Sequence, residues 1–303
     1  MREFEGYLLK LFTGTPLSQF SDSGAKRMSA KKPDLAIKDD VDSNRSRLRL
    51  VPVPRLAAGG RWRVEAMRSH SEPILLWFTR GQGRITVGGV TRGYGAHNAV
   101  FIPAGVMHGF EVGAQTHGTA VFFGRGCDVE LPLTAQHLRI RDAGPQAELS
   151  GLIDNIQREL DSGRPSADRA AQHHLGLLGV WLERHVELAR ADEKKPDAAR
   201  RLAARYTSLL ESNFRSGKGV AEYARALGVT STHLTRVCNQ TCGRSASDLL
   251  HDRVIFEARV LLSETKIPIA RVSETLGYTS AAYFTRAFQH RTGKTPSAFR
   301  KGG

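Results

Sequence analysis

Two Thr-Arg pairs stand fifty residues apart near the C-terminus, Thr235-Arg236 and Thr285-Arg286. The guanidinium group of arginine can donate two hydrogen bonds to the two acceptors on the edge of guanine, and a threonine methyl group can contact thymine. Each pair closes a near-repeat, LGVTSTHLTR in the first copy and LGYTSAAYFTR in the second. These residue types in a doubled pattern indicate chemistry suited to reading the base edges of DNA.

Each repeat has the pattern of two helices joined by a tight turn. The first helix is expected to end at a Leu-Gly pair, because Gly228 and Gly277 can take the left-handed conformation that stops a helix. A residue that can cap the next helix follows: Thr230 or Ser231 in the first copy, Thr279 or Ser280 in the second. Helix, turn and helix form the arrangement whose second helix enters the DNA major groove.

Spacing separates the inward side of each second helix from its outward side. Leu234 and Val237 in the first copy, and Phe284, Ala287 and Phe288 in the second, are expected to pack back onto the domain. The opposite stripe then faces outward. The residues predicted to contact DNA are Ser231, Thr232, Thr235, Arg236, Ser280, Ala281, Ala282, Thr285, Arg286 and Lys294.

The segment between the copies, SASDLLHDRVIFEARVLLSET, has apolar residues at helical spacing: Leu249, Val254, Ala258, Leu261 and Leu262. It predicts a helix of roughly 18 residues and roughly 27 Å. Such a helix could hold two reading helices about one DNA turn apart, near 34 Å. We therefore interpret the two copies of the repeat as a device by which one chain reads two successive major grooves.

Charge is concentrated in the same region. The chain of 303 residues has a formal net charge of +14. Residues 198–303 contain 17 Lys and Arg and 7 Asp and Glu, a net charge of +10, whereas the first 197 residues have +4. A polyanion is the expected partner, with nucleic acid first. Charge alone would also fit a basic surface kept for solubility.

Composition favours a soluble protein of a reducing compartment. No apolar run of about 18 residues indicates a membrane span, and the N-terminus lacks a signal-peptide core, so we expect a cytoplasmic location. Three cysteines, Cys127, Cys238 and Cys242, are too few and odd in number for a disulfide framework. We expect Cys238 and Cys242 to pack inside the helical domain rather than form a redox pair.

The chain divides at changes of composition. Residues 1–47 are expected to be a disordered tail. Residues 48–190 begin with short apolar runs interrupted by glycine, typical of a barrel or sandwich, and continue with two amphipathic helices. One helix could cover the sheet while the other dimerises, or both could pack on their own barrel. Residues 191–199 form a charged linker, and residues 200–303 are expected to be all helical.

The C-terminal region, about residues 200–301, closely resembles the AraC/XylS family of transcription regulators. The resemblance implies binding of promoter DNA, contact with RNA polymerase, and an N-terminal cupin sensor with dimerising helices. Where the family has a Phe in its first copy, this chain has Cys238, so the first head is expected to pack less tightly. The matching residues are Leu227-Gly228, Leu234, Arg236, Gly243, Arg253, Ala258, Leu261-Leu262, Ile269-Ala270, Leu276-Gly277-Tyr278, Tyr283-Phe284, Arg286, Phe288, Gly293 and Thr295-Pro296-Ser297.

The N-terminal region is similar to a cupin with a decayed metal motif. The stretch PAGVMHGF, which contains His108, matches the second cupin motif, although His97 stands where that motif has glycine. The first motif, usually His-x-His and then Glu, reads Arg68-Ser69-His70 with Ile74 at the glutamate position. Metal enzymes of this kind need about three ligands. We therefore expect no catalytic metal, no catalytic residue and no cofactor.

The remaining residues suit a pocket for a small organic anion such as an aromatic acid. Arg68 and His70 alternate onto one strand face, and His108 would come from a neighbouring strand. In a barrel, however, a histidine or tryptophan is more often a core or surface residue than a ligand contact. The residues predicted to bind this effector are Arg68, His70, Trp77, Phe101, His108 and Phe110.

The sequence therefore predicts a multidomain protein. It has an N-terminal cupin-like β-barrel with two following helices, and a C-terminal all-α domain of two helix-turn-helix units joined by a linker helix. We interpret it as a one-component regulator that binds promoter double-stranded DNA and a small-molecule effector and forms a possible homodimer, with no membrane partner. One alternative is a cupin-type metal enzyme fused to a DNA-binding domain, which metal analysis would distinguish. Another is a nonspecific architectural DNA binder, which the outward Thr and Arg residues argue against.

Overall fold

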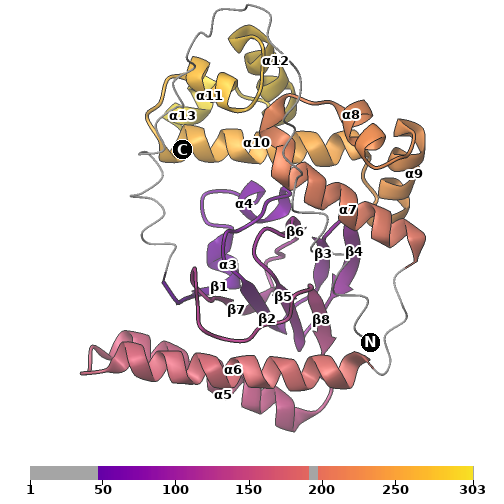
Figure 1. Cartoon of the computed structure of the whole chain (residues 1–303). Coiled ribbons are helices and arrows are strands. Elements are labelled where there is room, and N and C mark those ends of the chain that lie inside the picture. The colour runs from indigo at the N-terminus through magenta and orange to yellow at the C-terminus, as the bar shows by residue number, and fades with distance from the viewer. Residues whose placement is uncertain (1–46, 191–196, 303) are drawn as a thin grey trace, which may run out of the picture. The chain divides into compact units, whose positions relative to one another are not determined.

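A computed structural model describes residues 47–190 and 197–302 (Figure 1). The predicted tail, apart from Arg47, and the predicted linker, apart from its last three residues, lie outside the described residues. Within the described ranges the chain runs from short strands through two long helices to a wholly helical region. No helix in these ranges is long and apolar enough to cross a membrane.

The N-terminal region contains two antiparallel sheets. One has five strands in the order β1-β7-β2-β5-β8, and the other has three in the order β4-β3-β6. The strands are β1 (Arg49–Pro52), β2 (Ile74–Arg80), β3 (Gly83–Val87), β4 (Val90–Tyr94), β5 (Asn98–Ile102), β6 (His108–Phe110), β7 (His117–Phe122) and β8 (Gln136–Arg139), with short helices α3 (Val53–Leu56) and α4 (Trp62–Glu65) after β1.

The sheets face each other but do not close into the predicted cupin-like barrel, because no strand pairing among the described residues joins one sheet to the other. Side-chain packing holds them together instead. Phe78 of β2 stacks on Tyr94 of β4 with ring centroids 3.9 Å apart, and it lies 6.0 Å edge-on from Phe110 of β6. The sheet-rich region is thus a two-layer sandwich with an apolar interior.

Two long helices, α5 (Ala143–Ser162) and α6 (Ala167–Arg190), cover the outer face of the five-stranded sheet (Figure 1). Both contribute buried side chains to the same core as the sheet, among them Ile153 of α5 and Trp181 of α6. The prediction of two helices after the strands is confirmed. Helix α6 also keeps Leu177, Val180 and Leu188 exposed.

The C-terminal region consists of two heads on one long helix, α10. The predicted linker helix of roughly 18 residues is confirmed, since α10 has 19. We define the first head as residues 198–242 and the second head as residues 269–301. The first contains α7 (Ala198–Asn213), η2 (Phe214–Ser216), α8 (Val220–Ala226) and α9 (Ser231–Cys242); α10 (Ala246–Glu264) joins it to α11 (Ile269–Thr275), α12 (Ala281–Thr292) and α13 (Pro296–Lys301).

One hydrophobic core runs through both heads and α10. Cys238 is fully buried in it, and Cys242 is also buried, as predicted. Burial raises the pKa of Cys238 to about 12 and also raises that of Cys242. Both thiols therefore stay protonated near neutral pH and serve as packing residues.

Candidate functional site

The turns of the two heads have the conformation that their sequences predict. Gly228 and Gly277 are left-handed, with φ of 72° and 78°. Thr230 caps α9 by accepting a hydrogen bond from the His233 backbone nitrogen at 3.1 Å. Ser280 caps α12 by accepting from the Tyr283 nitrogen at 3.2 Å. Of the two alternatives in each copy, the structure selects Thr230 and Ser280.

The second turn is one residue longer than the first, since the cap follows Gly228 by two residues and Gly277 by three. Beyond the turn the two helices align residue for residue, fifty positions apart. Thr235-Arg236 therefore occupies the same place on α9 as Thr285-Arg286 does on α12. The two heads present their Thr-Arg pairs at equivalent helical positions.

Burial agrees with the predicted inward and outward sides. Leu234, Val237, Phe284 and Phe288 are buried. Thr235, Thr285 and Ala287 are half-buried, and the Thr285 hydroxyl donates to the Ala281 carbonyl at 2.9 Å. The other residues predicted to contact DNA are exposed, namely Ser231, Thr232, Arg236, Ser280, Ala281, Ala282, Arg286 and Lys294. The spacing argument was thus sufficient to place these side chains on the surface.

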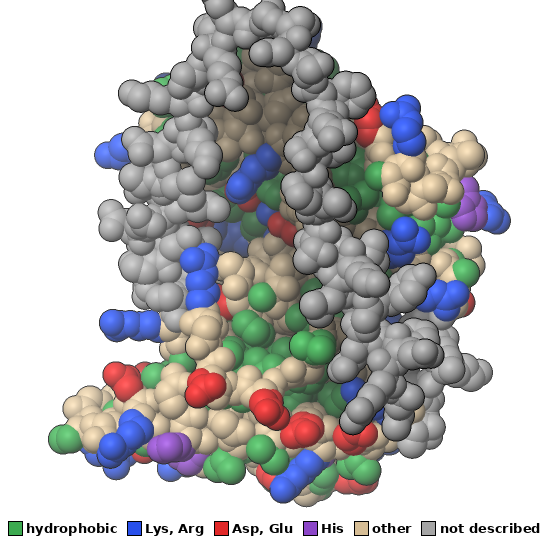
Figure 2. Space-filling view, viewed as in Figure 1, with side chains coloured by type: hydrophobic (Ala, Val, Ile, Leu, Met, Phe, Trp, Pro, Cys, Tyr) green, Lys and Arg blue, Asp and Glu red, His purple; other side chains and the backbone are tan. Residues whose placement is uncertain are grey.

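One aligned pair on this surface was missed. His233 and Tyr283 occupy the third position of α9 and α12, and the Tyr283 side chain is 56% exposed. The Arg236 guanidinium donates a hydrogen bond to His233 Nδ1 at 3.1 Å. The fifty-residue spacing of the Thr-Arg pairs already contained the equivalence of these two residues. Basic and histidine side chains project over the α8–α9 region in Figure 2.

The second candidate site surrounds Arg68 in the sheet-rich region. Arg68 and His108 form an isolated antiparallel bridge, with backbone N–O distances of 2.9 Å and 2.7 Å. The His70 and His108 rings lie 5.3 Å apart, and the Arg68 guanidinium carbon lies 5.4 Å from the Phe110 ring. Four of the predicted effector residues therefore gather in one place.

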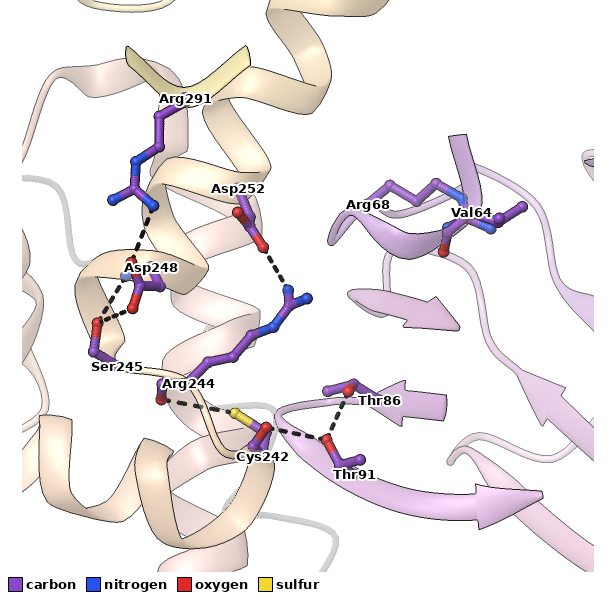
Figure 3. Close-up of polar contacts among 10 residues, drawn as sticks. All are labelled: Val64, Arg68, Thr86, Thr91, Cys242, Arg244, Ser245, Asp248, Asp252 and Arg291. Atoms are coloured by element: carbon purple, nitrogen blue, oxygen red, sulfur yellow. Dashed lines mark hydrogen bonds and ion pairs between the residues drawn. The ribbon is translucent and has the colours of Figure 1, made fainter. Parts of the chain in front are cut away.

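Arg68 is a buried cation, since only 4% of the residue's surface is exposed to solvent. It donates to the Val64 backbone carbonyl at 2.6 Å (Figure 3). No carboxylate among the described residues forms an ion pair with it. Burial lowers the pKa of Arg68 to about 9, so the side chain is still charged near neutral pH. A buried charge without a counter-charge is costly, and an anionic ligand would relieve that cost.

His108 provides a neutral acceptor beside this charge. Its Nδ1 lies 2.9 Å from the Val106 carbonyl, so Nδ1–H donates and Nε2 is left as an acceptor. Burial, together with the charge of Arg68, lowers the pKa of His108 to about 3. An arginine donor and a histidine acceptor could together bind a carboxylic ligand that also carries a hydroxyl group.

Two predicted effector residues lie elsewhere. Trp77 and Phe101 point to the outer face of the five-stranded sheet, where they pack under α5 and α6. The Trp77 indole nitrogen donates to the Ser150 hydroxyl of α5 at 3.1 Å. Neighbouring residues of a strand alternate between the two faces of a sheet. Ile74 of β2 and Ile102 of β5 face the interior. Trp77 and Phe101 lie an odd number of residues away from them on the same strands, so they face the other side. The prediction that they line the same pocket as Arg68 is wrong.

A family model for a helix-turn-helix domain matches residues 223–302. The arabinose operon regulatory protein of Escherichia coli (strain K12) is 30% identical to this chain over 164 residues. Its counterpart from Salmonella typhimurium (strain LT2) is 34% identical over 164 residues. The matched model covers both reading helices and α10. This chain is similar to regulators of the AraC family over about half of its length.

The AraC-family match covers part of each protein. It takes in 53% of this chain and 54% or 56% of the two arabinose regulators, so the chain spans about half the length of the curated relatives it matches. Among solved structures, ToxT from Vibrio cholerae O395 aligns over 84% of this chain and 96% of its own, with 9% identity and a TM-score of 0.40. A TM-score of that size does not establish a shared fold.

The Arg68 site has no metal-binding set among the described residues, where no group of three His, Cys, Asp or Glu side chains comes together. Ile74, at the position where cupins carry a ligating glutamate, is buried in the apolar interior. His70 and His108 alone fall short of the three ligands of a catalytic site. The residues present suit an organic ligand better than a metal ion.

His108 should make the sheet-rich region acid-sensitive. The unfolded chain protonates this histidine near its usual pKa of about 6.5, whereas the fold keeps it neutral down to about 3. Because the unfolded state binds more protons in that window, stability is full above pH 6.5 and falls below it, by about 2 kcal/mol at pH 5. Denaturant unfolding at several pH values should show this slope, and His108→Gln should reduce it. His137, whose pKa burial lowers to about 4, contributes to the slope that remains.

Proposed function

We propose that this chain is a sequence-specific regulator of promoter DNA whose binding is controlled by a small organic anion. The proposal of DNA binding rests on the pair of capped helices, α9 and α12, which expose Arg236 and Arg286 at equivalent positions. Two matched heads on one linker helix are suited to two successive major grooves. The net charge of +10 on residues 198–303 supports binding of a polyanion.

The buried charge of Arg68 supports an anionic effector. A carboxylate beside Arg68 would accept charge-assisted hydrogen bonds, a hydroxyl group of the same ligand could donate to His108 Nε2, and Phe110 would offer an apolar surface to the rest of the ligand. Fewer aromatic side chains line the Arg68 site than the sequence predicts, because Trp77 and Phe101 are on the other face of the sheet. The effector class is therefore a small carboxylic acid rather than a large apolar molecule.

Helix α4 contacts both the Arg68 site and the helical region, and so could transmit a change from one to the other. Arg68 holds the carbonyl of Val64, which lies in α4. At the start of the same helix, the Trp62 ring lies 5.7 Å from Phe256 of α10 and 6.0 Å from Phe299 of α13. A ligand that drew the Arg68 guanidinium away from Val64 would loosen α4 and shift the population of DNA-competent arrangements.

Three further parts of the proposal rest on the family. The protein contacts RNA polymerase, acts in the cytoplasm and forms a homodimer. The exposed Leu177, Val180 and Leu188 on α6 offer an apolar stripe for the dimer contact. The alternative, a cupin-type metal enzyme fused to a DNA-binding domain, is weakened by Ile74 at the ligand position. Stoichiometric metal in the purified protein, with activity lost on chelation, would restore it.

Arg236→Ala tests the DNA-reading role. If Arg236 contacts a base, the variant should lose about 1–3 kcal/mol of binding free energy on the preferred DNA. Loss on scrambled DNA should be much smaller. The measurement is fluorescence anisotropy of the full chain with a site selected from random DNA, at several salt concentrations. Equal losses on both DNAs would make Arg236 a phosphate contact. Failure of the wild-type chain to select any sequence would overturn the proposed function.

A further inference from the structure

The two heads touch each other through a pair of glycines. Gly217 follows η2 in the first head, and Gly277 follows α11 in the second, with φ of 72° and 78°. A methyl group added to Gly217 would lie 2.5 Å from the Gly277 carbonyl oxygen. One added to Gly277 would lie 2.5 Å from the Arg215 carbonyl oxygen. Real Cβ atoms essentially never approach within 3.0 Å. The backbones of the two heads are therefore in direct contact.

The first-head side of this contact is anchored to α10. The buried Arg253 of α10 binds Glu211 at 2.7 Å and 2.9 Å, and its guanidinium stacks over Phe214 of η2 at 3.8 Å. Arg215 of η2 forms an ion pair with Glu257 of α10. The turn that presents Gly217 cannot move without breaking buried contacts.

The second-head side is equally fixed. The Tyr278 nitrogen donates to the Ser273 carbonyl at 3.0 Å, which closes the turn around Gly277, and Leu276 is buried. Arg291, near the end of α12, donates to Asp248 of α10 at 3.1 Å, and Arg244, just after α9, pairs with Asp252 of α10 (Figure 3). Both reading helices are thus tied to the same stretch of the linker helix.

We propose that the Gly217–Gly277 contact fixes the separation of α9 and α12 and makes the protein specific for one spacing between its two half-sites on DNA. This rests on the proposed function, because spacing matters only if both heads read DNA. One added base pair moves a half-site by about 3.4 Å and turns it by about 35° around the duplex axis. Heads in backbone contact cannot follow that movement, so affinity falls at every other spacing.

The covalent join between α10 and the second head would not impose this by itself. Residues 265–268 connect α10 to α11 outside any helix or strand, and such a segment would let the second head pivot. The glycine contact removes that freedom because it bears on backbone atoms, which have no rotamers to adjust. Gly217 and Gly277 act as positioning residues for the DNA-reading side chains and do not themselves face DNA.

Gly277→Ala and Gly217→Ala test the contact from its two sides, and Gly228→Ala is the matched control. Gly228 is the equivalent turn glycine of the first head, with φ of 72°, and nothing lies within 4 Å of a methyl group added there. It therefore adds the same backbone strain without a collision. Binding of the full chain is measured on the selected site with the half-site spacing changed by one or two base pairs in either direction.

Wild-type protein and Gly228→Ala are expected to share one spacing optimum, with affinity lower by roughly tenfold or more one base pair away. Gly277→Ala and Gly217→Ala are expected to bind the optimal site roughly tenfold more weakly and to show a shifted or flattened spacing profile. Identical profiles for Gly277→Ala and Gly228→Ala would overturn the proposal. Thermal unfolding of each variant separates loss of the fold from loss of spacing.

A distance measurement without DNA separates this inference from the proposed function. Spin labels at Gln240→Cys on α9 and Gln289→Cys on α12, in a Cys127→Ser background, report the separation of the reading helices. Both glutamines are exposed, and the remaining native cysteines are buried. A single narrow distance in wild type and Gly228→Ala, shifted or broadened in Gly277→Ala, supports the inference. A broad wild-type distribution rejects it, whether or not the chain selects a DNA sequence.

Discussion

Arg253→Ala is expected to destabilise the helical region by about 3–5 kcal/mol. Arg253 is 5% exposed and makes charged contacts with Glu211 and Glu257. Burial alone would lower the pKa of Arg253, but the hydrogen bonds that it donates to Glu211 and the charge of Glu257 outweigh burial, so the net shift is upward. Removing the guanidinium would leave two carboxylates without their shared partner and would expose the Phe214 ring that it covers.

Equilibrium unfolding in denaturant, followed by helical circular dichroism, measures this loss. Arg271→Ala is the control, because Arg271 also pairs with a glutamate, Glu274, but both side chains are more than half exposed, at 63% and 59%. Such surface pairs contribute about 0–1 kcal/mol. Since a domain has only about 5–15 kcal/mol of stability, Arg253→Ala should also weaken DNA binding at growth temperature. Equal losses for the two variants would contradict the account of the buried network.

Arg68→Met is expected to abolish the effector response: the protein remains folded, and its DNA binding no longer changes when ligand is added. Among the described residues the buried charge is held by a hydrogen bond to the Val64 carbonyl and by the face of Phe110. Replacing it with an apolar side chain removes the cost of burying a charge, so stability without ligand should stay unchanged or rise. Loss of charged hydrogen bonds to a carboxylate would cost the ligand about 1.5–3 kcal/mol of binding free energy.

A panel of small organic acids tested by thermal shift provides the measurement, followed by a reporter dose–response with any acid that stabilises wild-type protein. Arg84→Met is the control in the same region, because Arg84 is exposed and paired with Glu111. It should retain the full response. An unchanged dose–response in Arg68→Met would mean that the effector binds elsewhere. Metal quantification on the same samples tests the enzyme alternative independently.

Local physical rules were sufficient for the helical region. Helix caps, left-handed glycines and the 3.6-residue period depend on neighbours within about four residues, so the sequence alone predicted the turns at Gly228 and Gly277 and the length of α10. The same rules separated buried Leu234 and Phe284 from exposed Arg236 and Arg286.

Strand faces were predicted less well because β2 is buried on both sides. Residues Ile74 to Phe78 are all apolar and all buried, so alternation gives no sign of which face meets the sheet interior and which meets α5 and α6. Trp77 was assigned to the Arg68 side for that reason. Barrel closure is likewise a matter of pairing between distant strands, and it does not occur among the described residues.

The sequence by itself determined that this protein has two capped helices with exposed arginines on a basic helical region, because each step depended on residue type and short-range spacing. Only the tertiary structure decided three things: that Arg68 is buried with no carboxylate partner among the described residues, that Trp77 and Phe101 lie apart from it, and that Gly217 meets Gly277. Gly217 and Gly277 are sixty residues apart, and Arg68 and His108 are forty apart. Contacts of that separation depend on how whole elements pack, which no local pattern records.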